Sequence, residues 1–158
     1  MDLMKLFRAT LPVLAALACS PAQADDLCPL VGALNRVLVE STGYAAIPCP
    51  EIGFAALDGQ PGMRSQAGAY FPETGRIELA PDLDLSTAYG QSFLLHEMVH
   101  AAQFAEGVEA EAPCTAALEA EAYRVQAQFL QKAGLTRDAL LTRMLGEQLG
   151  ACGASPEY

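Results

Sequence analysis

The sequence predicts an α+β fold with an N-terminal helix, a small three-stranded antiparallel sheet and three further helices. Two observations support this class. Apolar residues recur at helical spacing in four segments, whereas between residues 47 and 79 they form short runs separated by turn residues. A chain of 158 residues is long enough for one domain, and no internal repeat or interdomain linker divides it.

The first half of the chain holds one predicted helix and the predicted sheet. The helix is expected over Leu27 to Ser41, with apolar positions at Leu30, Val31, Leu34, Val37 and Leu38. Strands are expected over Ile52 to Leu57, Gly68 to Phe71 and Arg76 to Ala80. The turn Pro72-Glu73-Thr74-Gly75 indicates a hairpin between the last two strands.

A second helix is expected from about Thr87 to Ala105, with Asp84 or Ser86 as its N-terminal cap. Its apolar stripe contains Phe93, Leu94, Met98, Ala101 and Ala105. Tyr89 falls on a neighbouring face, where we expect it to pack in the core.

The last third is expected to be a loop followed by two helices. The acidic segment Glu106 to Pro113 contains turn residues and predicts a loop. A third helix is expected over Thr115 to Ala133, and Thr136 is expected to cap a fourth. The fourth helix carries an apolar stripe that we expect to be part of the core, formed by Leu140, Leu141, Met144, Leu145 and Leu149.

Residues 1–24 have the pattern of a secretory signal peptide, so we expect the domain to comprise residues 25–158. Lys5 and Arg8 precede a short apolar run, and Ala22-Gln23-Ala24 is a small-x-small cleavage signature. The run is too short for a membrane span. In an alternative interpretation, Cys19 is lipidated and becomes the first residue of a lipoprotein. The sequence therefore predicts a periplasmic or secreted protein.

Cleavage after Ala24 removes Cys19 and leaves an even number of cysteines. In an exported protein this favours two disulfides, for which we predict the sequence-local pairs Cys28–Cys49 and Cys114–Cys152. A less favoured alternative makes Cys114 a zinc ligand.

The formal net charge of −10 disfavours binding to nucleic acid and to anionic lipid, because both would be repelled. We expect a monomer.

Both histidines of the chain lie in His96-Glu97-Met98-Val99-His100, the pattern H-E-x-x-H. Four residues along an α-helix turn by about 400° and rise by about 6 Å, so His96 and His100 stack on one face and can bind one ion. Glu97 is rotated by about 100°, which keeps it from the ion but places it as a general base for a nearby water molecule. The motif predicts a zinc site.

A catalytic zinc usually has three protein ligands, and with both histidines used the third must be a carboxylate or a thiolate. Glu106 lies where a longer version of the motif has its last ligand, but on a continuous helix it faces away from His100. Glu119 and Glu121 on the following helix are better candidates, and Ala120 and Ala122 would let that helix approach closely.

Here the chain resembles the gluzincin branch of zinc metallopeptidases, in which H-E-x-x-H is followed on a later helix by a glutamate ligand, often in E-x-x-A. The matching segment is Glu119-Ala120-Glu121-Ala122. The resemblance covers about residues 68–131 and implies a minimal zincin-like domain with Glu119 as the third ligand and Glu121 as the alternative. It also implies that a sheet edge beside the motif helix holds extended peptide substrate.

The expected function is therefore zinc-dependent hydrolysis of peptide or protein substrates, with Glu97 activating water. The alternative is a non-catalytic zinc module that binds a peptide or partner. Many gluzincins stabilise the oxyanion with a further histidine, which this chain lacks. Tyr123, Arg76 and Tyr70 are candidates to replace it.

Overall fold

The computed structural model describes residues 27–57 and 67–153. The predicted signal peptide, its cleavage site and Cys19 lie outside these residues. Within them the protein is an α+β domain with five helices and a three-stranded sheet. Four of the helices and all three strands correspond to elements that the sequence predicts; the fifth is a short turn of helix.

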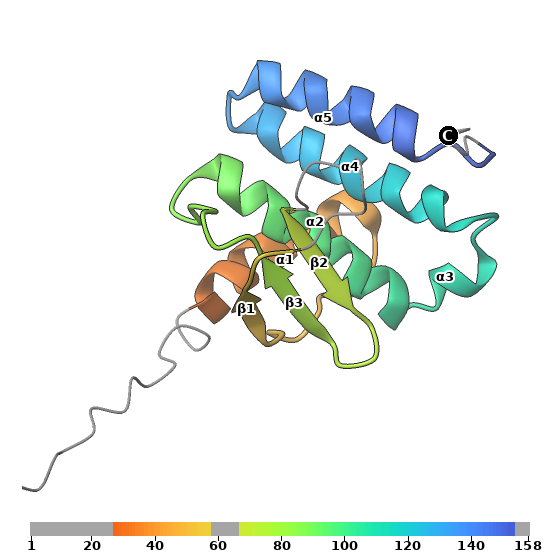
Figure 1. Ribbon diagram of the computed structural model, residues 1–158, viewed down its shortest axis with the longest axis horizontal. Helices are drawn as coiled ribbons and strands as arrows, with labels where there is room; N and C mark the ends of the chain where they lie inside the picture. Colours follow the sequence, from red (N-terminus) through yellow and green to blue (C-terminus); the bar gives the residue numbers. More distant parts are fainter. Residues whose placement is uncertain (1–26, 58–66, 154–158) are drawn as a thin grey trace, which may run out of the picture.

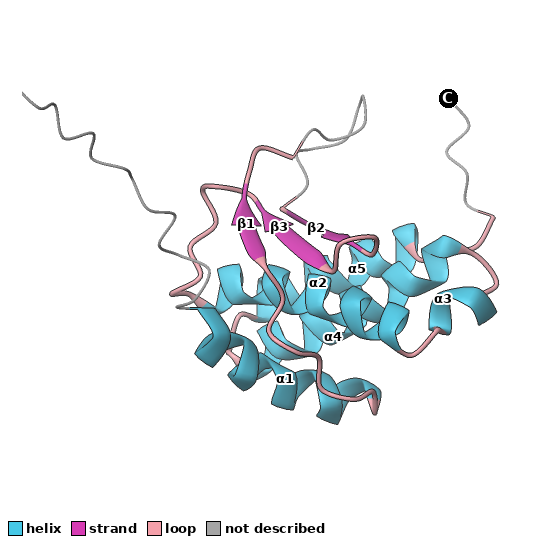
Figure 2. Cartoon of the chain, turned by 90° about the horizontal axis from the view of Figure 1, so that it is seen from below, coloured by secondary structure: helices cyan, strands magenta, loops and turns pink. Residues whose placement is uncertain are grey.

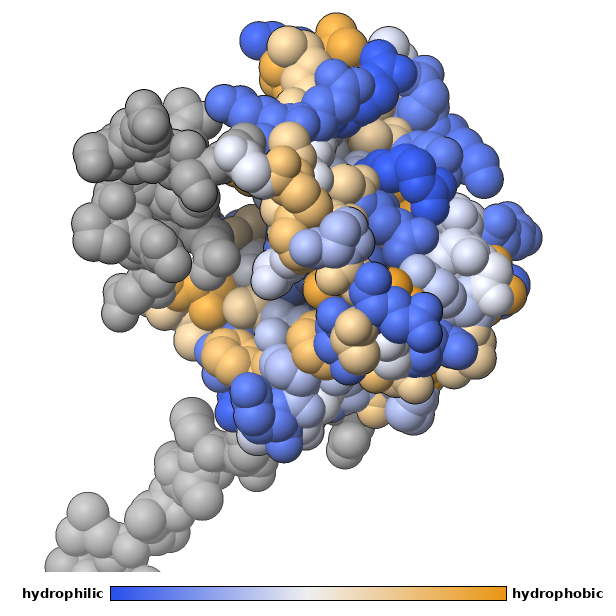
Figure 3. Space-filling view, turned by 90° about the vertical axis from the view of Figure 1, so that its right-hand side faces the viewer, coloured by the Kyte–Doolittle hydropathy of each residue, from blue (hydrophilic) through white to orange (hydrophobic). Residues whose placement is uncertain are grey.

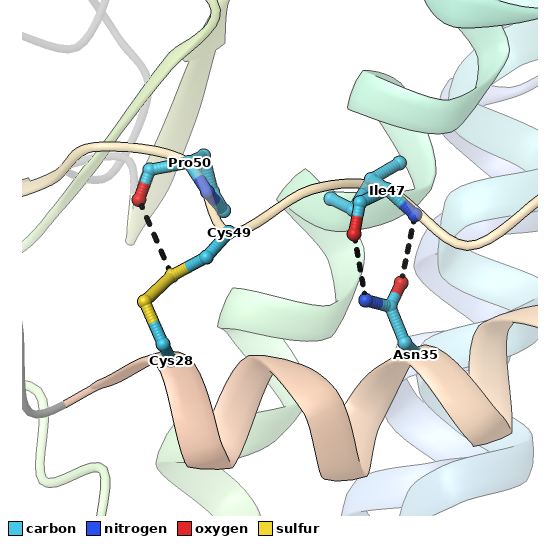
Figure 4. Close-up of a disulfide and its surroundings, with 5 residues drawn as sticks. All are labelled: Cys28, Asn35, Ile47, Cys49 and Pro50. Carbon is cyan, nitrogen blue, oxygen red and sulfur yellow. Dashed lines mark hydrogen bonds between the residues drawn. A yellow bond between two sulfur atoms is a disulfide. The ribbon is translucent and has the colours of Figure 1, made fainter.

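The first helix, α1 (Cys28–Thr42), is held to the segment before the sheet at two points (Figure 4). A disulfide joins Cys28 to Cys49. The Asn35 side chain exchanges two hydrogen bonds with the backbone of Ile47, donating at 2.8 Å and accepting at 3.1 Å. Gly43 ends the helix in the left-handed region, at φ 80°, where a residue without a Cβ is favoured.

The sheet is mixed rather than antiparallel, which corrects the sequence-based expectation. Its strands are β1 (Ile52–Phe54), β2 (Gly68–Phe71) and β3 (Arg76–Leu79), in the order β1-β3-β2. The predicted turn joins β2 and β3 as an antiparallel hairpin, but β1 pairs in parallel with β3. Periodicity reveals strands but not their partners, and the long connection after β1 allows either direction.

The motif helix α2 (Ala88–Ala105) runs through the centre of the domain. The sheet covers one side of it, while α1 and α4 (Thr115–Lys132) pack on the other (Figures 1 and 2). Thr87 caps α2 by accepting a hydrogen bond from the Gly90 amide at 3.1 Å, so neither Asp84 nor Ser86 is the cap. The core consists of apolar side chains from α2 itself, α1, the sheet and α4, among them Leu34, Leu38, Ile77, Leu79, Leu94, Leu95, Met98 and Val125.

The segment after α2 is not only a loop, because it contains the short helix α3 (Val108–Glu111). The last helix, α5 (Thr136–Leu149), packs on α4 at the edge of the molecule (Figure 1). Leu135 precedes it without a side-chain cap, so Thr136 is not the cap. Cys114 forms a disulfide with Cys152, which joins the start of α4 to the end of α5 and removes Cys114 as a metal ligand.

The apolar stripe of α5 is not in the core, which is a second correction. The exposed fractions of Leu140, Leu141, Met144 and Leu145 are between 42 and 55 %. Instead, the smaller residues Ala139 and Gly146 are buried against α4. Helical spacing identifies an apolar face but does not reveal whether anything covers it.

Candidate metal centre

The two motif histidines lie in the middle of α2, where the helix is enclosed by its neighbours. His96 and Glu97 are each only 7 % exposed. Buried polar side chains need partners, since an unsatisfied polar group costs about 1–3 kcal/mol. The partners of each motif residue therefore indicate what the site is built to hold.

Three side-chain donors converge in one place. The Nε2 atoms of His96 and His100 are 3.2 Å apart. The Glu119 carboxylate lies 3.3 Å from each of them, through Oε2 to His96 and through Oε1 to His100. This is the one group of three or more metal-ligating side chains found in the described ranges, and its donor atoms all lie within 4.8 Å of one another.

The separations suit a small metal ion. Zinc ligands lie about 2.0–2.2 Å from the ion, so two ligands at a tetrahedral angle are separated by about 3.3–3.6 Å. The donor separations at this site, 3.2, 3.3 and 3.3 Å, lie at or just below the short end of that range, so a shift of a few tenths of an ångström would centre an ion between them. Two imidazoles with one carboxylate leave a fourth position open.

The imidazole of His96 is oriented by a buried chain of hydrogen bonds. Its Nδ1 lies 3.1 Å from Oε1 of Gln126, and Nε2 of Gln126 donates to the Ser92 hydroxyl at 3.1 Å. Ser92 in turn donates to the Tyr89 carbonyl at 2.7 Å. Because the Gln126 amide nitrogen is committed to Ser92, its oxygen faces the ring and Nδ1 must carry the proton. The lone pair on Nε2 is thus left for an ion.

His100 is oriented in the same way. Its Nδ1 lies 2.9 Å from Oε1 of Gln103, which is fully buried. Nε2 of Gln103 donates to the Leu118 carbonyl and to Oε2 of Glu121, both at 3.1 Å. Two glutamines therefore perform at this site the orienting role that carboxylates and carbonyls often have behind metal-bound histidines.

Glu121 belongs to the residues that orient the histidines from behind and not to the donor group. In addition to Gln103, its carboxylate accepts from the Tyr44 hydroxyl at 2.6 Å and from Arg124 at 3.3 Å. Burial, followed by the bond to Glu121, raises the pKa of Tyr44 to about 12, so the phenol stays a donor. The structure therefore brings Glu119, and not Glu121, to the histidines.

The Glu119 carboxylate has the charge that a cation requires, whereas His100 must release a proton when it binds one. Burial alone would raise the pKa of Glu119, but hydrogen bonds with His100 and His96 outweigh it and hold that pKa well below its usual range. Burial likewise acts to lower the pKa of His100, and the hydrogen bond and charge of Glu119 reverse the effect and raise it. Glu119 is thus ionised, the form in which a carboxylate binds metal.

Glu97 lies beside the donor group and against the sheet. A Cβ added to Gly68 would stand 2.7 Å from Oε1 of Glu97, so β2 can approach this closely only because Gly68 has no side chain. The Tyr70 backbone amide donates a hydrogen bond to the carboxylate. Burial raises the pKa of Glu97, and the two nearby histidines act against this rise.

The three candidates for oxyanion contact are placed differently. The ring of Tyr123 packs edge-on against His96 with a centroid distance of 4.5 Å. The ring of Tyr70 packs on Phe104, so only its backbone reaches Glu97. Arg76 pairs with Glu78 at 3.4 Å and Glu51 at 3.7 Å, and is not brought to the histidines.

Tyr89, expected in the core, is 48 % exposed and packs edge-on against Phe93.

Four residues that surround the donor group were not predicted from the sequence to belong to the site: Gln103, Gln126, Ser92 and Tyr44. A signal for two of them was present: Gln103 is three residues after His100, and Gln126 is seven after Glu119, so each shares a helix face with a candidate ligand. Amides on otherwise core-facing helix sides are rare and need partners. No comparable spacing links Tyr44, which is 77 residues from Glu121.

Fold and site together define an α+β domain with a candidate His/His/Glu metal centre on an H-E-x-x-H helix. The chain matches, over residues 30–147, the family described as "Domain of unknown function (DUF6647)", and it belongs to that family. The matched segment contains the whole donor group. Neither the curated proteins nor the solved structures yielded a match.

Proposed function

We propose that this protein is an exported zinc-dependent peptidase of zincin-like architecture, in which His96, His100 and Glu119 hold the metal and Glu97 is the general base. One observation carries the proposal. Three donor atoms converge, one fewer than the four ligands of a tetrahedral ion, and a buried carboxylate lies beside them against the backbone of an outer strand. A structural zinc site is usually closed by four protein ligands and needs no base.

The donor set favours zinc over harder or softer ions. Two imidazoles and one carboxylate with an open position are typical of catalytic zinc, whereas calcium and magnesium prefer oxygen ligands. When bound there, zinc would supply a Lewis acid and lower the pKa of a water molecule to about 7.

Strand β2 is suited to hold an extended peptide. It is one of the two outer strands of the described sheet, and the Ala80 amide donates to the Ala67 carbonyl at 2.9 Å. Hydrogen-bonded pairs alternate along an antiparallel ladder. The backbone N–H and C=O groups of Ala67 therefore point toward β3, whereas those of Gly68 and Tyr70 point away from it. A substrate added along this side would run past Glu97.

Glu97 can both take and return a proton. Its burial raises its pKa, which makes the carboxylate a stronger base than an exposed glutamate. It would remove a proton from the attacking water and deliver it to the leaving amine. The Tyr70 amide limits the rotation of this carboxylate.

Tyr123 is the best-placed group to stabilise the developing oxyanion. Burial and the nearby Glu119 and Glu97 raise its pKa to about 12, so it is a protonated phenol at neutral pH. Its ring lies against His96. A phenol in this position supplies the hydrogen bond that a histidine supplies in many gluzincins.

Location outside the reducing cytosol is supported by the two disulfides, which are typical of oxidising compartments. None of the described helices is long and apolar enough to cross a membrane.

The narrow setting of Glu97 favours a second candidate, a zinc module that binds peptides without cleaving them. The carboxylate is 7 % exposed and hydrogen-bonded to Tyr70, so a substrate carbonyl must enter a confined space. In this case a strand of the partner would still pair with β2.

The test combines metal content with hydrolysis, using untagged protein comprising residues 25–158 with both disulfides formed. We expect one zinc per chain and cleavage of an unfolded protein substrate. Glu97→Gln should keep the zinc and lose at least about 100-fold in rate, because the amide cannot accept the proton. Zinc retention without cleavage in the wild type would favour the binding module. A folded protein without zinc would overturn both the peptidase and the binding module.

A further inference from the structure

The α5 helix is packed with its small residues inward and its large residues outward. Ala139 is 5 % exposed, and a Cβ on Gly146 would stand 2.5 Å from Cβ of Tyr123, so the two helices approach through small side chains. On the opposite side, four large apolar residues are about half exposed: Leu140, Leu141, Met144 and Leu145. We call these four residues the α5 face.

An apolar stripe of this kind on a helix usually faces a core or a partner. Here the described residues leave the stripe uncovered, because the helix on which α5 packs is α4, on the opposite side. Scattered apolar residues are common on surfaces, but four within six positions form a contiguous patch.

The charge around the α5 face is unlike that of the whole protein. The chain has a formal net charge of −10, and hydrophilic residues cover much of the side shown in Figure 3. Helix α5 itself carries Arg137 and Arg143 against Asp138 and Glu147, so its net charge is zero. Because two acidic molecules repel each other, a neutral helix that also exposes large apolar side chains is a surface on which two copies can meet.

The stripe is also self-complementary. Positions 140, 141, 144 and 145 are symmetric about the midpoint between Thr142 and Arg143. An antiparallel pairing of two α5 helices therefore places Leu140 opposite the partner's Leu145 and Leu141 opposite the partner's Met144. A two-fold interface requires this kind of self-matching surface.

The same pairing brings opposite charges together. In this register the partner's Glu147 lies level with Asp138 and one residue from the position level with Arg137. Arg137 precedes Leu141 by four residues and Met144 by seven, so it shares the face of the stripe and is the residue that approaches the partner's Glu147. Arg137 makes no ion pair with any described residue and is free to do so.

We propose that the α5 face is the interface of a two-fold homodimer in which the α5 helices of two copies pack antiparallel. This revises the monomer expected from the sequence and does not depend on the metal centre. Because the helix is short, the dimer buries less surface than a standard complex, which buries about 1,600 Å². We therefore expect association in the micromolar range.

The test is the molar mass of the oxidised protein of residues 25–158, measured by sedimentation and light scattering between about 1 µM and about 200 µM. We expect the wild type to pass from monomer to dimer over this range. Leu141→Glu and Met144→Glu should each remain monomeric throughout, because each would bury a charge against the partner.

Val39→Glu is the matched control, since Val39 is 39 % exposed on α1 and the variant adds the same charge. It should dimerise as the wild type does. Circular dichroism and zinc content, measured for each variant, establish that it is folded. The proposal is overturned if the wild type is monomeric at every concentration, if the α5 variants still dimerise, or if Val39→Glu dissociates equally.

A charge cycle tests the antiparallel register. Arg137→Glu and Glu147→Arg should each weaken the dimer several-fold, and the double variant should restore it. If the double variant is weaker than both single ones, the helices are not paired in this register.

Discussion

Helix α4 contacts α2 on one side and α5 on another, and the two boundaries are built differently. Toward α2 it presents buried polar groups with specified partners, such as Gln126 with His96 and Ser92. Toward α5 it presents small residues, where Ala120 and Gly150 bring the two backbones together. Hydrogen bonds fix direction and distance, whereas small residues permit close approach but bury little apolar area.

This difference shows where each region obtains its stability. The α2–α4 boundary combines apolar packing with satisfied polar groups, so a metal site can be held there in one geometry. The α4–α5 boundary is closely approached at Gly146 and Gly150, and the Cys114–Cys152 disulfide ties the ends of the two helices together. Substitutions at the two boundaries should therefore differ in their effects on metal binding and stability.

Removal of a ligand should have the largest effect. Glu119→Ala should abolish zinc binding at micromolar metal, because only two protein ligands remain. Glu121→Ala should retain the zinc with weaker affinity, since Glu121 acts through Gln103. Metal analysis after dialysis distinguishes them. Equal loss from both variants would show that Glu121 is a ligand and that the arrangement seen here is wrong in that respect.

Truncation of a core leucine should have the next largest effect. Leu95 on α2 is fully buried, so Leu95→Ala should lower the free energy of unfolding by about 2–5 kcal/mol. Leu141→Ala on α5 removes the same atoms from a half-exposed site and should change the stability of the monomer by less than about 0.5 kcal/mol. Urea unfolding at low protein concentration measures both. A cost at Leu141 near that at Leu95 would mean that the α5 face is covered within one chain.

Removal of the second disulfide should act on α5 before it acts on the site. The Cys114→Ser/Cys152→Ser variant opens a loop of 38 residues and should lower stability by about 2–4 kcal/mol. Proteolysis between α4 and α5 should become faster while bound zinc is retained. If zinc is lost first, the position of α4 depends on α5 more than the packing suggests.

Loss of an orienting amide should have the smallest effect of the four. Gln126→Ala leaves Nδ1 of His96 without its acceptor and should weaken zinc affinity by about 10–100-fold. Gln128→Ala, on an exposed position of the same helix, serves as the control and should leave affinity unchanged. Competition with a coloured chelator gives both values. An unchanged affinity in Gln126→Ala would show that packing alone orients the ring.

Much of the local structure was predictable because local signals determine it. The helices and the β2–β3 hairpin follow from apolar spacing and from turn residues such as those at Pro72 to Gly75. Both disulfide pairings were also predicted and are confirmed. The direction of β1 was not, because strand pairing depends on how a long connection crosses the sheet.

By itself the sequence determined which residues could act together on one helix. The spacing of His96 and His100 puts both on one face whatever surrounds them, since the α-helix repeats every 3.6 residues. The tertiary structure alone shows that Glu119 lies beside the histidines and that Glu121 bonds to Gln103, because residues two positions apart on α4 face different neighbours. The tertiary structure alone revealed that the large apolar residues of α5 face outward. The spacing of apolar residues along a helix is the same whether that face is covered or exposed.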